Sequence, residues 1–179
     1  PPRFVASRHH GKDDHASNHS CLPPRLARVL AMNAVQFAQM SCGVFFMTGL
    51  VTGIWKYRSI ITNVEGQAPV YVDICHRAAL MYAFACLVLA EFARLSAWGE
   101  LVNLAAVALP VVFFAAAVGS YAIHGFLQDT NNQLRRPHKL GQAHVHGAVV
   151  SSFIYLLAAG EIGGFAVLFA GFVQKLASA

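Results

Sequence analysis

Residues 70–95 read VYVDICHRAALMYAFACLVLAEFARL, an almost continuously apolar run that is interrupted by Asp73, His76, Arg77 and Glu91. A helix needs about 20 apolar residues to cross the hydrocarbon core of a bilayer, and this run is long enough. An ionisable side chain at membrane depth is costly and usually faces a partner, a cavity or a cofactor. The run therefore predicts a transmembrane helix in which His76 has a specific partner.

Three further apolar stretches accompany this run and give the chain its expected architecture. Hydrophobic residues make up 56% of the sequence and charged residues only 12%, whereas about 25% are charged in an average soluble domain. The four expected spans cover residues 29–55, 70–95, 101–127 and 144–173. Because the connection at residues 96–100 is very short, neighbouring spans are expected to run antiparallel. The sequence thus predicts an all-α, multi-pass integral membrane protein, an antiparallel four-helix transmembrane bundle surrounded by the lipid bilayer.

Residues 1–28 differ from the rest of the chain, because they are polar and contain several prolines and histidines. Four histidines lie in this tail: His9, His10, His15 and His19. We expect the tail to be disordered or extended, with the transmembrane domain occupying residues 29–179. A metal held by the tail histidines is the alternative interpretation.

Antiparallel order sorts the basic residues onto two membrane faces. The face that holds both termini carries Arg25, Arg28, Arg94 and Lys175. The opposite face carries Lys56, Arg58, Arg77, Arg135, Arg136 and Lys139. The positive-inside rule favours the second face as cytoplasmic, by a margin narrow enough to leave the orientation open. No segment of the sequence offers a basic face with interleaved aromatic residues, which argues against nucleic acid as a partner.

Histidines gather at the second of these faces. His76 lies near the start of the second span and His124 near the end of the third, so the two are expected at similar depths on neighbouring helices. The segment that follows adds His138, His144 and His146. A neutral imidazole can be an axial ligand of haem, and several imidazoles together can hold a transition metal. Hydrogen bonding among the histidines and the loop is the third interpretation.

The haem interpretation assigns roles to specific residues. His76 is the expected iron ligand, and His124 is an alternative second ligand. Basic residues of the same face, Lys56, Arg58 and Arg77, are candidate partners for two propionates.

Small residues and one deep carboxyl mark two other features of the spans. Gly49 and Gly53 form a GxxxG motif in the first span, and Gly160 and Gly164 form another in the fourth. Both motifs predict close helix packing, within one chain or between copies. Glu161, near the middle of the fourth span, is expected to be a protonated, hydrogen-bonded carboxyl; a proton relay or a subunit contact is the alternative.

Residues 49–55 read GLVTGIW and residues 76–82 read HRAALMY. These stretches resemble the styrene oxide isomerase family, whose members are small four-span membrane enzymes that assemble as trimers. The resemblance implies a haem b bound between subunits through His76, with ferric iron acting as a Lewis acid that converts an epoxide into an aldehyde. It also places Tyr82 where the family has an amide-bearing pocket residue, and it makes Tyr121 a candidate pocket hydroxyl.

Two classes of function follow from these features. The first is a Lewis-acid isomerase for a hydrophobic, epoxide-like substrate, in which a bound metal is the electrophile. Its expected apolar walls are Phe45, Phe46, Met47, Met81 and Phe84. The second is a non-catalytic subunit or anchor of a larger respiratory or other membrane complex, with or without a haem held by both His76 and His124. Either class is expected to form a homo-oligomer or to join other membrane subunits.

Overall fold

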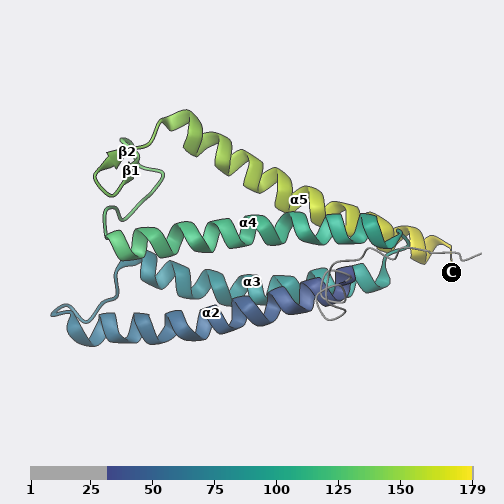
Figure 1. The fold of residues 1–179 in the computed structure, drawn as a ribbon, viewed down its shortest axis with the longest axis horizontal. Helices are drawn as coiled ribbons and strands as arrows, with labels where there is room; N and C mark the ends of the chain where they lie inside the picture. Colours follow the sequence, from purple (N-terminus) through teal and green to yellow (C-terminus); the bar gives the residue numbers. More distant parts are fainter. Residues whose placement is uncertain (1–31, 179) are drawn as a thin grey trace, which may run out of the picture. The chain divides into compact units, whose positions relative to one another are not determined.

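The computed structural model describes residues 32–178, so the expectations for the histidine-containing tail at residues 1–28 lie outside the described residues. Four helices and one short hairpin make up this part (Figure 1): α2 (Ala34–Thr62), α3 (Val70–Leu95), α4 (Glu100–Leu127), β1 (Lys139–Leu140), β2 (Ala143–His144) and α5 (Gly147–Ala177). Each of these helices is long and apolar enough to cross a membrane. The predicted all-α, multi-pass integral membrane protein with a four-helix bundle is therefore confirmed.

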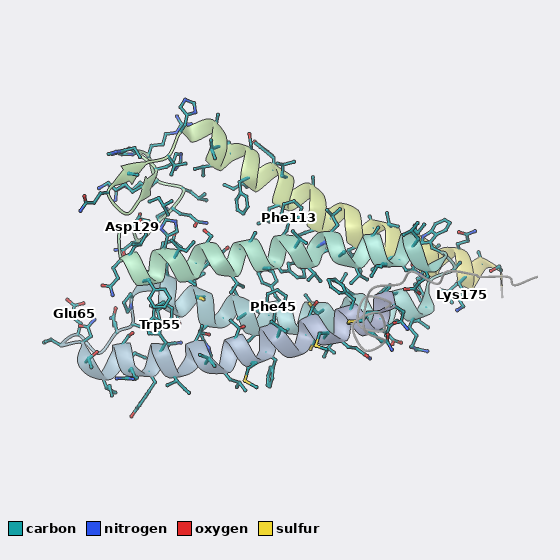
Figure 2. All side chains as sticks on the ribbon, in the orientation of Figure 1. Phe45, Trp55, Glu65, Phe113, Asp129 and Lys175 are labelled. Atoms are coloured by element: carbon teal, nitrogen blue, oxygen red, sulfur yellow. The ribbon has the colours of Figure 1, made fainter. Side chains whose placement is uncertain are left out.

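The helices run alternately up and down, as the short connections require. Glu65, in the turn between α2 and α3, lies at the same end as Asp129, which follows α4, while Lys175 of α5 lies at the other end (Figure 2). The predicted bounds of α3 are those observed, and α4 begins one residue earlier than expected, at Glu100. Pro69 stands directly before α3, where a missing backbone N–H costs nothing.

Four further helix ends differ from the prediction. Helix α2 begins at Ala34, where Asn33 caps it, rather than at residue 29, and α5 ends at Ala177 rather than at residue 173. The first span was expected to end at Trp55, but α2 continues to Thr62 because residues 56–62 contain neither glycine nor proline. The start of α5 is Gly147 rather than residue 144, since residues 143 and 144 pair with β1 and the His146 imidazole caps the helix. Hydropathy marks the depth of the bilayer, and a helix can extend beyond it.

The bundle interior is made largely of small side chains. Buried alanines line the contacts of α2, α3 and α4: Ala34, Ala38, Ala79, Ala83, Ala90, Ala93, Ala106 and Ala117. The Gly49 position contacts the Leu80 side chain, and a Cβ at Gly125 would lie 2.8 Å from the Trp55 ring. In lipid, close backbone approach supplies the dispersion contacts that hold helices together. The first GxxxG motif thus packs within the chain, which is one of the two predicted arrangements.

Helix α5 contacts α4 through its own glycines. A Cβ at Gly164 would lie 2.5 Å from Cδ of Pro110 and 2.6 Å from the Ala106 carbonyl oxygen, and Gly160 meets the Phe113 ring. In the turn between α3 and α4, the Trp98 indole donates a hydrogen bond of 2.8 Å to the Val167 carbonyl oxygen of α5. The N-terminal end of α5 diverges from α4 toward the β1–β2 hairpin (Figure 1). The close contact therefore covers only part of α5.

Candidate functional site

His76 of α3 is held by the backbone of α2. Its Nδ1 lies 2.8 Å from the Gly49 carbonyl oxygen. A carbonyl oxygen only accepts hydrogen bonds, so Nδ1 carries the proton and the lone pair of the neutral ring is on Nε2. Nε2 is not buried and has no hydrogen-bond partner among residues 32–178. This geometry leaves Nε2 free to bind a metal, as in histidine ligands whose other nitrogen donates to a backbone carbonyl.

Gly53 makes room for the His76 ring. A Cβ at this position would lie 3.0 Å from Cε1 and 3.3 Å from Nδ1 of the imidazole. Those distances are too short for an undisturbed contact, so a larger residue at position 53 would displace the ring. The pair Gly49 and Gly53 therefore does two things at once: it admits α3 close to α2, and it seats the imidazole.

The basic residues expected near a haem are partly neutralised. Asp73 bridges two of them, with Oδ1 lying 2.6 Å from Lys56 Nζ and Oδ2 lying 2.7 Å from Arg77 Nη2. Two cations on one carboxylate leave one positive charge beside the His76 helix. Arg58 is exposed and has no ion-pair partner among the described residues. A propionate at this face would compete with Asp73 for Lys56 and Arg77. Arg58, which has no ion-pair partner among the described residues, would be available to it.

The structure places the two candidate tyrosines inside the bundle. Tyr82 stacks on Phe114 at a centroid distance of 4.2 Å, with Phe45 at 6.2 Å, and Tyr121 stacks on Tyr71 at 6.1 Å. None of these contacts brings either ring to the His76 imidazole, which faces α2. The pocket roles assigned to Tyr82 and Tyr121 stay predictions.

Glu161 of α5 approaches the same interior. One of its carboxylate oxygens, Oε1, is buried and has no hydrogen-bond partner among residues 32–178. The expected hydrogen bond to this carboxyl is thus missing for Oε1 in the described part of the chain.

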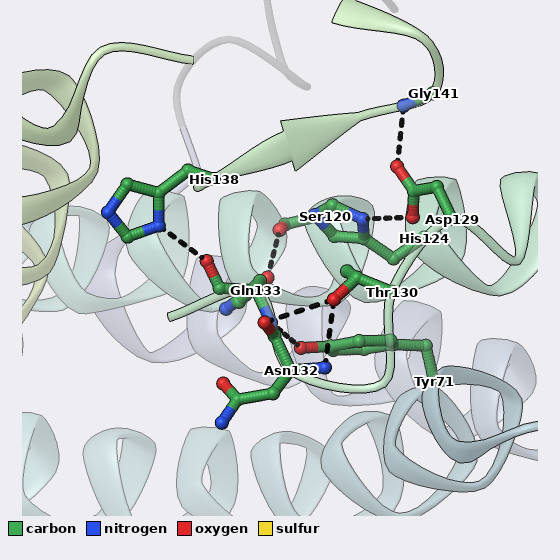
Figure 3. Close-up of polar contacts among 9 residues, drawn as sticks. All are labelled: Tyr71, Ser120, His124, Asp129, Thr130, Asn132, Gln133, His138 and Gly141. Atoms are coloured by element: carbon green, nitrogen blue, oxygen red, sulfur yellow. Dashed lines mark hydrogen bonds and ion pairs between the residues drawn. The ribbon is translucent and has the colours of Figure 1, made fainter. Parts of the chain in front are cut away.

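His124, the other candidate ligand, belongs to a different network (Figure 3). Its Nδ1 lies 2.8 Å from Oδ1 of Asp129, and both side chains are almost completely buried. The second oxygen of Asp129 accepts a 2.5 Å hydrogen bond from the Gly141 N–H. Burial raises the pKa of the Asp129 carboxyl, but the hydrogen bonds from His124 and Gly141 lower it by more, so the pKa lies below its ordinary value. Asp129 is therefore an ionised anchor that joins the end of α4 to the β1–β2 turn.

Gln133 fastens the same loop to the helices (Figure 3). Its backbone N–H donates to the Tyr71 hydroxyl at 2.5 Å, and its side-chain Oε1 accepts from the Ser120 hydroxyl at 3.0 Å. Its carbonyl oxygen lies 3.0 Å from Nδ1 of His138. The Tyr71 ring also lies against His124, with centroids 5.1 Å apart. Histidines of this face therefore use hydrogen bonds to organise residues 128–146, which is one of the three predicted interpretations.

Sequence reasoning missed three residues of this network: Tyr71, Ser120 and Gln133. The first two are polar side chains at the ends of apolar runs that meet at one face, and that position is the signal that could have found them. Nothing in the sequence indicates that Gln133 reaches both.

The structure brings some candidates together and separates others. His76 contacts α2 whereas His124 contacts Asp129 and Tyr71, so each imidazole has its own partner. Within residues 32–178 no three histidine, cysteine, aspartate or glutamate side chains form a group able to hold a metal ion. Of the expected apolar walls, Phe45 is buried in the core and the other four are exposed on α2 and α3: Phe46, Met47, Met81 and Phe84.

Comparison of the chain with protein-family models, curated proteins and solved structures finds no match. The resemblance to the styrene oxide isomerase family accordingly stays a prediction.

Proposed function

We propose that this membrane protein binds haem b through Nε2 of His76. The observation that carries the proposal is the state of that imidazole: Nδ1 is committed to the Gly49 carbonyl, and Nε2 is accessible. A hydrogen bond from Nδ1 fixes the tautomer and the ring orientation, and it raises the basicity of the nitrogen that binds the metal. The space left by Gly53 is the second support, since it seats the ring without strain.

When bound, such a group supplies a ferric iron that acts as a Lewis acid toward the oxygen of a hydrophobic, epoxide-like substrate. The residues of the chain have their own tasks. Gly49 holds the proton on Nδ1 of His76, and Asp73 orders the Lys56 and Arg77 side chains that are available to the propionates. His124 is engaged by Asp129, which supports His76 as the single histidine that would hold the group.

The outward faces of α2 and α3 support an oligomer. Phe46 and Met47 of α2 and Met81 and Phe84 of α3 are all exposed in a single copy. In a membrane these side chains meet lipid or another subunit. We infer that a neighbouring copy or another membrane subunit would cover these exposed side chains.

An optical and electron paramagnetic resonance spectrum of the full chain, purified after haem supplementation, tests the proposal. We expect a high-spin, five-coordinate ferric haem that is lost in His76→Ala and retained in His124→Ala. Aldehyde formation from a hydrophobic epoxide by the wild type, but not by His76→Ala, tests the isomerase assignment separately. Haem binding that survives His76→Ala would contradict the assigned ligand.

The alternative function has its own signature in the same experiment. A low-spin, bis-histidine spectrum lost in both His76→Ala and His124→Ala would favour an electron-transfer subunit of a larger complex. A chain that takes up no haem would favour a structural anchor. Either result would remove the isomerase proposal.

A further inference from the structure

A cavity of about 470 Å³ lies between α4, the 128–146 loop and the first half of α5. Its walls are mostly apolar, with Gly119 and Ile123 on the α4 side and Val149, Phe153 and Ile154 on the α5 side. The volume falls within the range of about 300–1,000 Å³ that is typical of ligand pockets. The N-terminal part of α5 diverges from α4 (Figure 1), and residues of both helices line the cavity.

The first half of α5 has few protein contacts that cover it. All six residues from 151 to 156 are exposed, although Phe153 and Ile154, which line the cavity, are only 36% and 37% exposed. The loop that separates this half from α4 is held in place by Asp129 and Gln133. The opening is therefore maintained by a loop that hydrogen bonds hold in place, and its walls are mostly apolar.

The end of the cavity next to the loop is basic. Lys139 and His138 line it, and His138 is only 8% exposed. A second hollow begins on the other side of His138 and is lined by Arg136, His144 and His146 at the start of α5. No aspartate or glutamate lines either hollow in the described part of the chain. An apolar cleft thus leads to a polar hollow whose charge is positive.

We propose that this cleft binds one anionic phospholipid, with an acyl chain between α4 and α5 and the phosphate beside Lys139 and Arg136. Apolar walls that end in cations match the two ends of such a molecule. Basic pockets between membrane helices bind anionic headgroups in this way. The site is separate from the His76 site, so the proposal does not depend on haem.

Lipid binding to the detergent-purified full chain tests this proposal by native mass spectrometry, with dioleoylphosphatidylglycerol and dioleoylphosphatidylcholine as the two probes. We expect the anionic lipid to bind more tightly than the zwitterionic one. Because one basic side chain near a membrane surface contributes about fivefold in affinity, Lys139→Gln is expected to reduce that preference about fivefold. Lys175→Gln, which removes the same charge at the opposite end, is expected to leave it unchanged.

A second pair of variants tests the apolar part of the site. A Cβ at Gly119 or at Gly43 would meet nothing within 4 Å, so both positions are open at the point where a leucine side chain begins. Gly119→Leu fills the cleft and is expected to abolish binding of both lipids, whereas Gly43→Leu on α2 retains it. Circular dichroism of both variants verifies the fold. If Gly119→Leu does not fold, the comparison of Lys139→Gln with Lys175→Gln tests the lipid site.

Three results would overturn the proposal. The first is equal affinity of the wild type for the two lipids. The second is unchanged lipid binding in Gly119→Leu. The third is an oligomer that dissociates in Gly119→Leu while its bound lipid is kept, which would identify a second copy of the chain as the occupant of the cleft.

Discussion

Nδ1 of His76 donates to the carbonyl oxygen of Gly49 across the contact of α3 with α2, at 2.8 Å. The bond joins a side chain that the sequence singles out to a backbone atom that the sequence does not. It fixes which nitrogen of the ring is available, and the first two predictions concern the surroundings of His76 and of His124.

Gly53→Ala is expected to lower haem affinity about tenfold, in the range seen when the support of a metal-binding histidine is disturbed. The added Cβ would lie 3.0 Å from Cε1 of His76 and would push the ring away from the Gly49 carbonyl. Titration of the purified apoprotein with haem measures the effect. Gly43→Ala, which meets nothing within 4 Å, is the matched control, and equal affinities in the two variants would show that Gly53 does not seat the imidazole.

Asp129→Asn is expected to destabilise the protein by about 1–3 kcal/mol at neutral pH, because it weakens two buried hydrogen bonds to a charged acceptor. The pKa of Asp129 is lower in the folded protein than its ordinary value of about 3.9. Its contribution is therefore complete above that value and is lost as the pH falls through the folded pKa. Unfolding in mixed micelles from pH 7 to pH 3, followed by circular dichroism, measures both effects.

The wild type and Asp129→Asn should accordingly approach each other in stability as the solution is acidified. A stability difference that stays constant down to pH 3 would show that the carboxylate charge is not what holds the β1–β2 turn.

Tyr71→Phe is expected to cost about 1–3 kcal/mol, because the Gln133 N–H loses its acceptor in a part-buried position. Tyr121→Phe is the control: its ring stacks on Tyr71, and its hydroxyl makes no hydrogen bond to the described residues. Hydrogen exchange of the Gln133 amide gives a local measurement beside global unfolding. If both variants lost the same stability, ring packing rather than the hydrogen bond would be responsible.

Gly164→Ala is expected to destabilise the contact of α5 with α4 by about 1–3 kcal/mol. The new Cβ would lie 2.6 Å from the Ala106 carbonyl oxygen, and a backbone atom cannot move aside as a side chain can. Gly163→Ala, one residue earlier, meets nothing within 4 Å and is expected to gain about 0.4–1 kcal/mol. Unfolding of both variants in detergent measures the two changes in the free energy of unfolding. Changes of opposite sign would verify that Gly164 faces α4 and Gly163 does not, and changes of equal sign would contradict it.

The fold was predictable because it depends on hydropathy and on connection length. The bounds of α3 followed from an apolar run that begins directly after Pro69. The end of α2 did not follow, since the apolar run ends before Lys56 and Arg58 although the helix continues through both to Thr62. Charged residues mark where the hydrocarbon core ends, but they do not show where the helix ends.

The candidate site was predictable only as a set of side chains at one face. Depth along the helices placed His76 and His124 together, but the rotation of each helix decides what a side chain meets. His76 turned out to face α2, and His124 faces a loop whose Gln133 reaches a tyrosine 62 residues earlier in the chain. Such pairings depend on tertiary packing, which hydropathy does not encode.

The confinement of glycine contacts to one part of α5 has a consequence for the environment in which the protein works. Packing on Pro110 and Phe113 secures the helix from Gly160 onward, while residues 151–156 are exposed and have fewer contacts with the rest of the chain. The thickness and fluidity of the membrane then help to set the inclination of that half, because a tilted apolar helix adjusts to the hydrocarbon depth around it. Stability measured in one detergent is thus a property of the protein and its solvent together.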